Sequence, residues 1–94
     1  MAKSEHLDVL RQGIEIWNEW RSHRHGRPSL RQAKLYRASL AFGDLRGADL
    51  PGADLRGANL EYSDLTHAHL TGADLRGAKL IEAKLFGAQL RVLY

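Results

Sequence analysis

Residues 43–62 read GDLRG ADLPG ADLRG ANLEY, with a leucine at every fifth position. The spacing continues for thirteen leucines: Leu30, Leu35, Leu40, Leu45, Leu50, Leu55, Leu60, Leu65, Leu70, Leu75, Leu80, Leu85 and Leu90. A small residue stands two positions before each leucine, except at Pro28. A period of five fits neither an α-helix nor an alternating flat strand. The pattern therefore predicts a chain that turns a corner every five residues and buries one leucine and one small residue each time.

The composition of this 94-residue chain limits its chemistry. It has no cysteine, which excludes disulfides, a thiolate nucleophile and cysteine-ligated metals. No apolar run reaches the roughly 20 residues of a membrane span, and residues 1–6 lack the apolar stretch of a signal peptide. We therefore predict one small, soluble, cytoplasmic protein without a transmembrane segment.

The N-terminal segment carries a helical pattern, and we predict one helix over residues 5–23. Ser4 is its expected N-cap, and Gly26 and Pro28 end it. Two lines of residues follow helical spacing: Leu7, Leu10, Ile14 and Trp17, and beside them Val9, Gly13, Ile16 and Trp20. The predicted organisation is a capping helix and linker over residues 1–27 and a repeat unit over residues 28–94, with Trp17 or Trp20 lying over the first coil.

The repeats resemble the pentapeptide-repeat family, whose motif is Ala-Asp/Asn-Leu followed by two variable residues. Residues 48–52, 53–57, 58–62 and 73–77 carry this motif, and residues 16–21 resemble the N-terminal segment of many bacterial members. Some repeats have lysine at the Asp/Asn position, which leaves the inward pattern intact: Lys34, Lys79 and Lys84. The resemblance implies an all-β solenoid, a right-handed quadrilateral β-helix of about three coils capped by one N-terminal α-helix.

Four pentads per coil would place residues twenty apart above one another. This rule stacks Phe42 on Tyr62 and places these two residues, together with Ile81 and Phe86, on two adjacent sides. Exposed aromatic residues suit protein interfaces, so these four residues form a candidate partner surface. The alternative is that they are scattered surface apolar residues without a role.

The C-terminal end of the predicted solenoid has no helix to cover it. The candidate dimer end consists of Leu90, Val92, Leu93 and Tyr94. An open β-edge with apolar residues invites pairing with another chain, so we predict an end-to-end homodimer. A larger partner subunit covering this end is the alternative.

Charged and histidine residues have two readings each. Three aspartate–arginine pairs flank leucines and are either contacts for a charged partner or exposed ion pairs worth ~0–1 kcal/mol each: Asp44 and Arg46, Asp54 and Arg56, Asp74 and Arg76. The His23–His25 and His67–His69 pairs have a spacing seen in metal sites. Two ligands do not complete a site, and His69 stacks between Asp49 and Gln89, so we predict no metal and no cofactor.

No catalytic arrangement is present, and a leucine–alanine interior leaves no cavity for a small-molecule substrate. We therefore predict a non-enzymatic structural or protein-interaction scaffold.

Some family members mimic duplex DNA and bind DNA gyrase, but those are long and acidic, whereas this chain is basic, with Arg46, Arg56 and Arg76 outside. A second alternative is weak binding of nucleic acid or a membrane surface by the basic cluster 21–27. Favourable dipole interactions at a helix C-terminus also explain that cluster.

Overall fold

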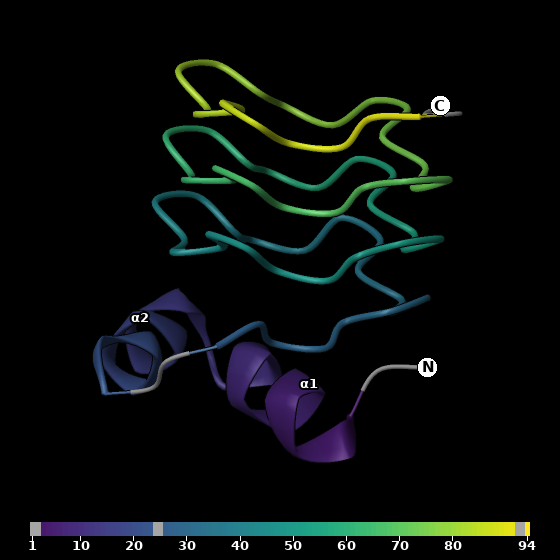
Figure 1. The fold of residues 1–94 in the computed structure, drawn as a ribbon. Coiled ribbons are helices and arrows are strands. Elements are labelled where there is room, and N and C mark those ends of the chain that lie inside the picture. The colour runs from purple at the N-terminus through teal and green to yellow at the C-terminus, as the bar shows by residue number, and fades with distance from the viewer. Residues whose placement is uncertain (1–2, 24–25, 92–93) are drawn as a thin grey trace.

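The leucine repeat winds the chain into stacked coils in the computed structural model of the protein, which describes residues 3–23, 26–91 and 94 (Figure 1). From residue 29 to residue 69, each residue that precedes a leucine forms an isolated parallel bridge with the residue twenty positions later. The bridges are Ser29–Asp49, Lys34–Asp54, Ser39–Asn59, Asp44–Asp64, Asp49–His69, Asp54–Asp74, Asn59–Lys79, Asp64–Lys84 and His69–Gln89. One coil therefore contains four pentads, one on each of its four sides.

Backbone hydrogen bonds between coils repeat with the same period. Leu50 donates its N–H to the carbonyl of His69 in the next coil at 2.8 Å. His69 donates its N–H to the carbonyl of Ala48 in the preceding coil at 2.9 Å. A third bond closes each corner within the coil, as between the Ala53 N–H and the Leu50 carbonyl at 3.1 Å. Because each coil supplies partners to both neighbours, a coil at either end of the stack needs something else to complete its hydrogen bonds.

The interior contains the leucines and the small residues of the repeat. The buried apolar residues of the stack run from the first coil to the start of the last: Leu30, Ala33, Leu35, Leu40, Leu45, Ala48, Leu50, Ala53, Leu55, Ala58, Leu60, Leu65, Ala68, Leu70 and Ala73. Burying one leucine side chain contributes roughly 1.5–3 kcal/mol. Leu75, Leu80 and Leu85 are only partly buried, because no described coil lies above them.

Corner residues adopt the left-handed conformation, which turns the chain toward the next side. Glycine takes this position at many corners, as at Gly52 with φ of 68°. Phe42, Tyr62 and His67 also adopt it, with φ between 60° and 63°. Their side chains therefore project outward from the corners at a conformational cost that glycine does not have.

The N-terminal segment forms two helices, so the prediction of one continuous helix is wrong. The helix α1 spans Ser4–Arg11 and α2 spans Ile14–Ser22. Gly13 separates them with φ of 114°, a conformation that residues with side chains rarely adopt. The predicted N-cap is also wrong: Lys3 occupies that position, without a side-chain cap, and Ser4 is the first helical residue.

The helix α2 completes hydrogen bonds on one side of the first coil. Trp17, fully buried, donates Nε1–H to the carbonyl of Asp44 at 2.8 Å. Asn18 accepts from the N–H of Asp44 at 2.8 Å and donates to the carbonyl of Phe42 at 3.0 Å. Arg21 donates to the carbonyl of Arg46 at 2.6 Å. Side chains of α2 therefore make the bonds that another coil would make on this side.

Residues at the start of α1 complete hydrogen bonds on a neighbouring side of the first coil. Ser29 donates its N–H to Nδ1 of His6 at 2.9 Å and accepts from the N–H of Lys3 at 3.2 Å. On the two remaining sides, the N–H groups of Lys34 and Ser39 have no hydrogen-bond partner among the described residues. The helices thus complete two of the four sides of the first coil.

Gly43 explains how closely α2 approaches the stack. It occupies the small-residue position, where the other repeats from residue 33 onward carry alanine or serine. A Cβ atom at Gly43 would lie 2.8 Å from Cδ1 of Ile14 and 2.8 Å from the carbonyl oxygen of Leu40. The missing methyl group leaves room for Ile14 at the beginning of α2.

We predict that Gly43→Ala lowers the free energy of unfolding by about 1–3 kcal/mol, because overpacking displaces Ile14. Urea denaturation followed by circular dichroism measures the difference. Ser63→Ala is the matched control, since it changes the same position one coil later and is expected to cost about 1 kcal/mol or less. A Gly43→Ala variant as stable as the wild type would contradict this packing.

Candidate interaction surfaces

Aspartate–arginine pairs follow the outer sides of the stack. Arg56 donates Nε–H and Nη2–H to the two carboxylate oxygens of Asp54, each at 2.8 Å, and its backbone N–H to Oδ1 at 3.2 Å. The pairs Asp44–Arg46 and Asp74–Arg76 have the same arrangement. Two-pronged contacts of this kind fix the side-chain geometry, so these sides present both charge signs at fixed positions.

Hydrogen bonding within these pairs changes the acidity of the carboxyl groups. The side-chain hydrogen bond from Arg56 lowers the pKa of Asp54 to about 2. The corresponding bonds from Arg46 and Arg76 lower the pKa of Asp44 and Asp74. The carboxylates are solvent-accessible, so the pairs are the exposed ion pairs of the sequence interpretation, with a small contribution to stability.

The candidate partner surface has one tightly ordered part. Phe42 and Tyr62 stack with ring centroids 5.0 Å apart and 7° between the ring planes, which confirms the stacking expected from the twenty-residue rule. They are 66% and 52% exposed. The Tyr62 N–H donates to the carbonyl of Ile81, which is exposed in the next coil. Three of the four predicted residues thus belong to one corner region.

Phe86, the fourth residue of this surface, has a different neighbour. Its exposed ring meets the edge of the His67 ring at 5.6 Å between centroids and 71° between planes. His67 lies at the next corner of the stack, whereas Phe42 and Tyr62 lie at the preceding one. The candidate surface therefore extends across a side instead of forming a single aromatic cluster.

At the C-terminal end, no described element packs on the last coil (Figure 1). Leu90 is 41% exposed, and Tyr94 is also exposed. Among the described residues, the N–H groups of Leu80, Leu85 and Leu90 have no partner. The other two members of the candidate dimer end, Val92 and Leu93, lie outside the described residues.

Two of the described histidines in the His-x-His pairs have an acidic neighbour. His69 lies 3.8 Å from Asp49, and His23 lies 3.1 Å from Glu19. Within residues 3–23, 26–91 and 94, no three His, Cys, Asp or Glu side chains are grouped as a metal site requires. His25 falls outside these residues.

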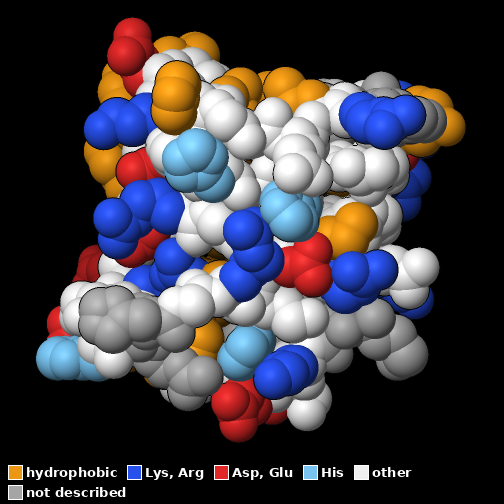
Figure 2. Space-filling model, in the orientation of Figure 1, with side chains coloured by type: hydrophobic (Ala, Val, Ile, Leu, Met, Phe, Trp, Pro, Cys, Tyr) orange, Lys and Arg blue, Asp and Glu red, His pale blue; other side chains and the backbone are white. Residues whose placement is uncertain are grey.

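The two described arginines of the basic cluster 21–27 donate to different backbone carbonyls of the stack. Arg21 lies under the first coil, whereas Arg27 donates Nη1–H to the carbonyls of Gly47 at 3.0 Å and His67 at 3.3 Å. Arg24 lies outside the described residues. Figure 2 shows basic, acidic and histidine side chains intermixed on one face, with hydrophobic side chains along the upper, C-terminal rim. The described arginines therefore do not form one continuous basic patch.

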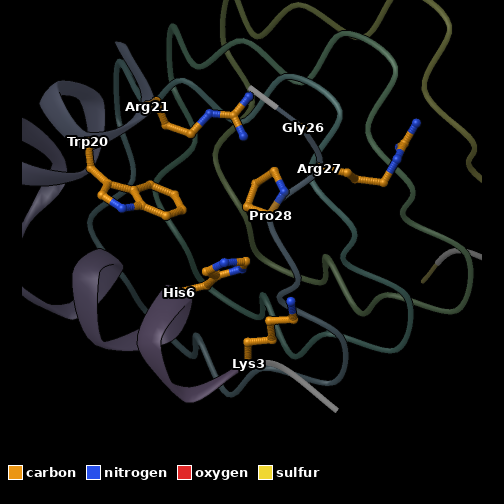
Figure 3. Close-up of a pocket in the computed structure, with 7 residues that line it drawn as sticks. All are labelled: Lys3, His6, Trp20, Arg21, Gly26, Arg27 and Pro28. Carbon is orange, nitrogen blue, oxygen red and sulfur yellow. The ribbon is translucent and has the colours of Figure 1, made fainter. Parts of the chain in front are cut away.

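Sequence reasoning missed a pocket at the N-terminal end (Figure 3). It has a volume of about 130 Å³ and is lined by Lys3, His6, Trp20, Arg21, Gly26, Arg27 and Pro28. The buried His6 was not singled out, because its spacing in the helix gives no signal for its bond to Ser29.

Among the described residues, no helix is long and apolar enough to span a membrane.

The family model for pentapeptide repeats matches residues 29–52 and 53–91, with eight copies of the repeat. The chain belongs to the pentapeptide-repeat family. This confirms the resemblance seen in the leucine and alanine pattern. Comparison with curated proteins finds no match.

Two solved pentapeptide-repeat proteins from Nostoc sp. PCC 7120 are similar to this one. HetL, a protein involved in the regulation of heterocyst differentiation, is 41% identical, with a TM-score of 0.54 over 66% of this chain. The chain of 94 residues covers only 30% of the length of HetL. The protein alr5209 is 35% identical over 90% of this chain and 74% of its own, with a TM-score of 0.49.

We predict that Arg56→Gln raises the pKa of Asp54 from about 2 toward its ordinary value, because the two charge-assisted hydrogen bonds are lost. A pH titration of the carboxyl ¹³C signal measures it. Since the folded-state pKa is depressed, the pair stabilises the fold above the unfolded-state pKa, and this contribution is lost as the pH falls toward 2.

Arg11→Gln is the control for this titration, because Arg11 has no part in the pair. An Asp54 titration that is the same in the wild type and in Arg56→Gln would show that the pair does not persist in solution.

Proposed function

We propose that this pentapeptide-repeat protein is a non-enzymatic interaction scaffold in the bacterial cytoplasm that associates with a second copy through its C-terminal end. The proposed architecture is a right-handed quadrilateral β-helix of about three coils, with residues 28–94 as the stack and residues 1–27 as its cap. The difference between the two ends carries the proposal: α1 and α2 pack on the first coil, and no described element packs on the last.

The last coil offers both hydrogen-bond donors and acceptors. The N–H groups that face the open end include those of Leu80, Leu85 and Leu90, which have no partner among the described residues. By the pattern of the lower coils, the carbonyls of Ala78, Ala83 and Ala88 are the matching acceptors. A second copy presents the same groups, so a two-fold contact can pair donors with acceptors.

Apolar surface favours the same contact. Leu75, Leu80 and Leu85 are only partly buried, and Leu90 is exposed. Covering them would bury surface that equivalent leucines bury in the lower coils, at about 25 cal/mol per Å². The end face therefore combines an open backbone edge with an incompletely buried core.

A non-enzymatic role agrees with the character of the stack. Its interior is filled by leucine and small side chains, and the aspartates with lowered pKa lie half-buried on the outer sides, paired with arginine. Catalytic groups instead need a cleft that excludes water and shifts their pKa toward the working pH. This supports a role in binding through the outer surfaces.

The test is the mass in solution of the wild type and of Leu90→Asp, measured by light scattering across a concentration series. We expect a dimer for the wild type and a monomer for Leu90→Asp, because the charge opposes burial of the end face. Phe42→Asp, an exposed change at the other end of the stack, is the control and should remain dimeric.

Circular dichroism of Leu90→Asp shows whether the coils persist. A wild type that stays monomeric at high concentration would refute self-association. A Leu90→Asp variant that is folded and fully dimeric would place the contact elsewhere.

The corner of Phe42, Tyr62 and Ile81, together with Phe86, is the second candidate, a surface for a different protein. Its support is the exposed stack of Phe42 on Tyr62, since aromatic residues recur in interface centres. Tyr62→Glu should abolish capture of a native partner in affinity purification. Tyr36→Glu, which alters a tyrosine of similar exposure on another side, should not. Equal capture by both variants would remove this candidate.

The two alternatives have less support. A DNA mimic needs a continuous negative exterior, but Arg46, Arg56 and Arg76 pair with the aspartates on this stack. Binding of nucleic acid or a membrane by the cluster 21–27 needs free cationic groups, whereas Arg21 and Arg27 donate to backbone carbonyls. Gyrase inhibition, or binding of DNA that weakens steeply with salt, would reverse this ranking.

A further inference from the structure

The pocket at the N-terminal end lies where the beginning of α1, the end of α2 and residues 26–28 meet (Figure 3). Four of its lining residues have nitrogen-bearing side chains that can be cationic: Lys3, His6, Arg21 and Arg27. No aspartate or glutamate lines it among the described residues. Glu5 lies 3.7 Å from Nε2 of His6, so the lining itself is cationic, with an acid beside it.

Arg21 is the central observation. Its side chain is only 8% exposed, and burial lowers the pKa of its guanidinium. Nη2 donates to the carbonyl of Arg46, but Nε is buried and has no hydrogen-bond partner among the described residues. A buried charged donor left unsatisfied is costly.

The nearest acid does not satisfy Arg21. Asp44 lies 3.8 Å from Arg21, beyond hydrogen-bond distance. Both carboxylate oxygens of Asp44 already accept hydrogen bonds from Arg46, each at 2.8 Å. The buried Arg21 guanidinium therefore shares the Asp44 carboxylate with Arg46, which makes the closer contacts.

Lys3 and His6 add donors on the opposite wall. Because the backbone N–H of Ser29 donates to Nδ1 of His6, a neutral His6 ring carries its proton on Nε2 and is a donor there. The Lys3 side chain extends toward Pro28 in Figure 3, whereas the Arg27 guanidinium turns away along the stack. Arg27 thus adds positive charge at the edge of the pocket, but its guanidinium does not point into it.

We propose that this pocket binds one small tetrahedral oxyanion, the phosphate group of inorganic phosphate or of a soluble phosphate monoester. A guanidinium and an ammonium are the side-chain groups that bind phosphate best in proteins. A single water needs roughly 10–15 Å³ of such space, so the pocket of about 130 Å³ accommodates a phosphate group with water around it. Bound phosphate would give the buried Arg21 a counter-ion that it does not share with Arg46.

The test is a titration of the full chain with inorganic phosphate at constant ionic strength, followed by ¹H–¹⁵N spectra. Saturable shifts are expected at the Trp20 indole and the Gly26 amide, which line the pocket. Lys3→Gln should weaken binding by about tenfold, the effect of losing one charge-assisted hydrogen bond. Arg11→Gln, at the far end of α1 and outside the pocket, should leave it unchanged.

Two further titrations use glycerol phosphate and duplex DNA in place of inorganic phosphate. Binding of inorganic phosphate alone identifies a site for the free ion, and binding of glycerol phosphate as well identifies a site open to monoesters. Shifts with DNA but with neither small phosphate would overturn the proposal in favour of a surface that binds nucleic acid. Unsaturable shifts, or equal weakening in Lys3→Gln and Arg11→Gln, would also overturn it.

Discussion

The structure depends on one hydrogen bond that recurs along the stack: the N–H of a leucine donates to the carbonyl nineteen residues later, as from Leu50 to His69. This bond fixes the twenty-residue coil and thereby directs leucine and alanine inward. It also leaves unmatched groups wherever the stack begins or ends. The two ends of this protein meet that constraint in different ways.

At the N-terminal end, polar side chains of the helices substitute for a missing coil. Asn18 and His6 accept backbone N–H groups that would otherwise donate to a lower coil, and Trp17 and Arg21 donate to the carbonyls. Meeting these carbonyls draws Arg21 into a buried position, which creates the cationic pocket. The same packing requires glycine at residue 43. The C-terminal end has no such substitute among the described residues, and our proposal assigns its completion to a second copy.

Much of this could be predicted from the sequence, because the repeat is local and strict. The leucine period implies the stack, and the twenty-residue rule implies that Phe42 lies on Tyr62. The break at Gly13 was not predicted because apolar residues continue at helical spacing across it, although glycine is the residue that adopts such a φ most readily. The roles of His6 and Asn18 were hidden because their partners are 23 and 26 residues away. Contacts between a helix and a distant corner depend on docking geometry, which the pattern does not encode.

Amide hydrogen exchange of the native protein tests the account most directly, because it reports each backbone N–H separately. We predict slow exchange at Leu50, and also at Ser29 and Asp44, whose partners are the helix side chains His6 and Asn18. Fast exchange is predicted at Lys34 and Ser39, which lie in the same coil on the sides that the helices do not complete. Equal exchange at all four first-coil amides would contradict the claim that the helices substitute for a coil.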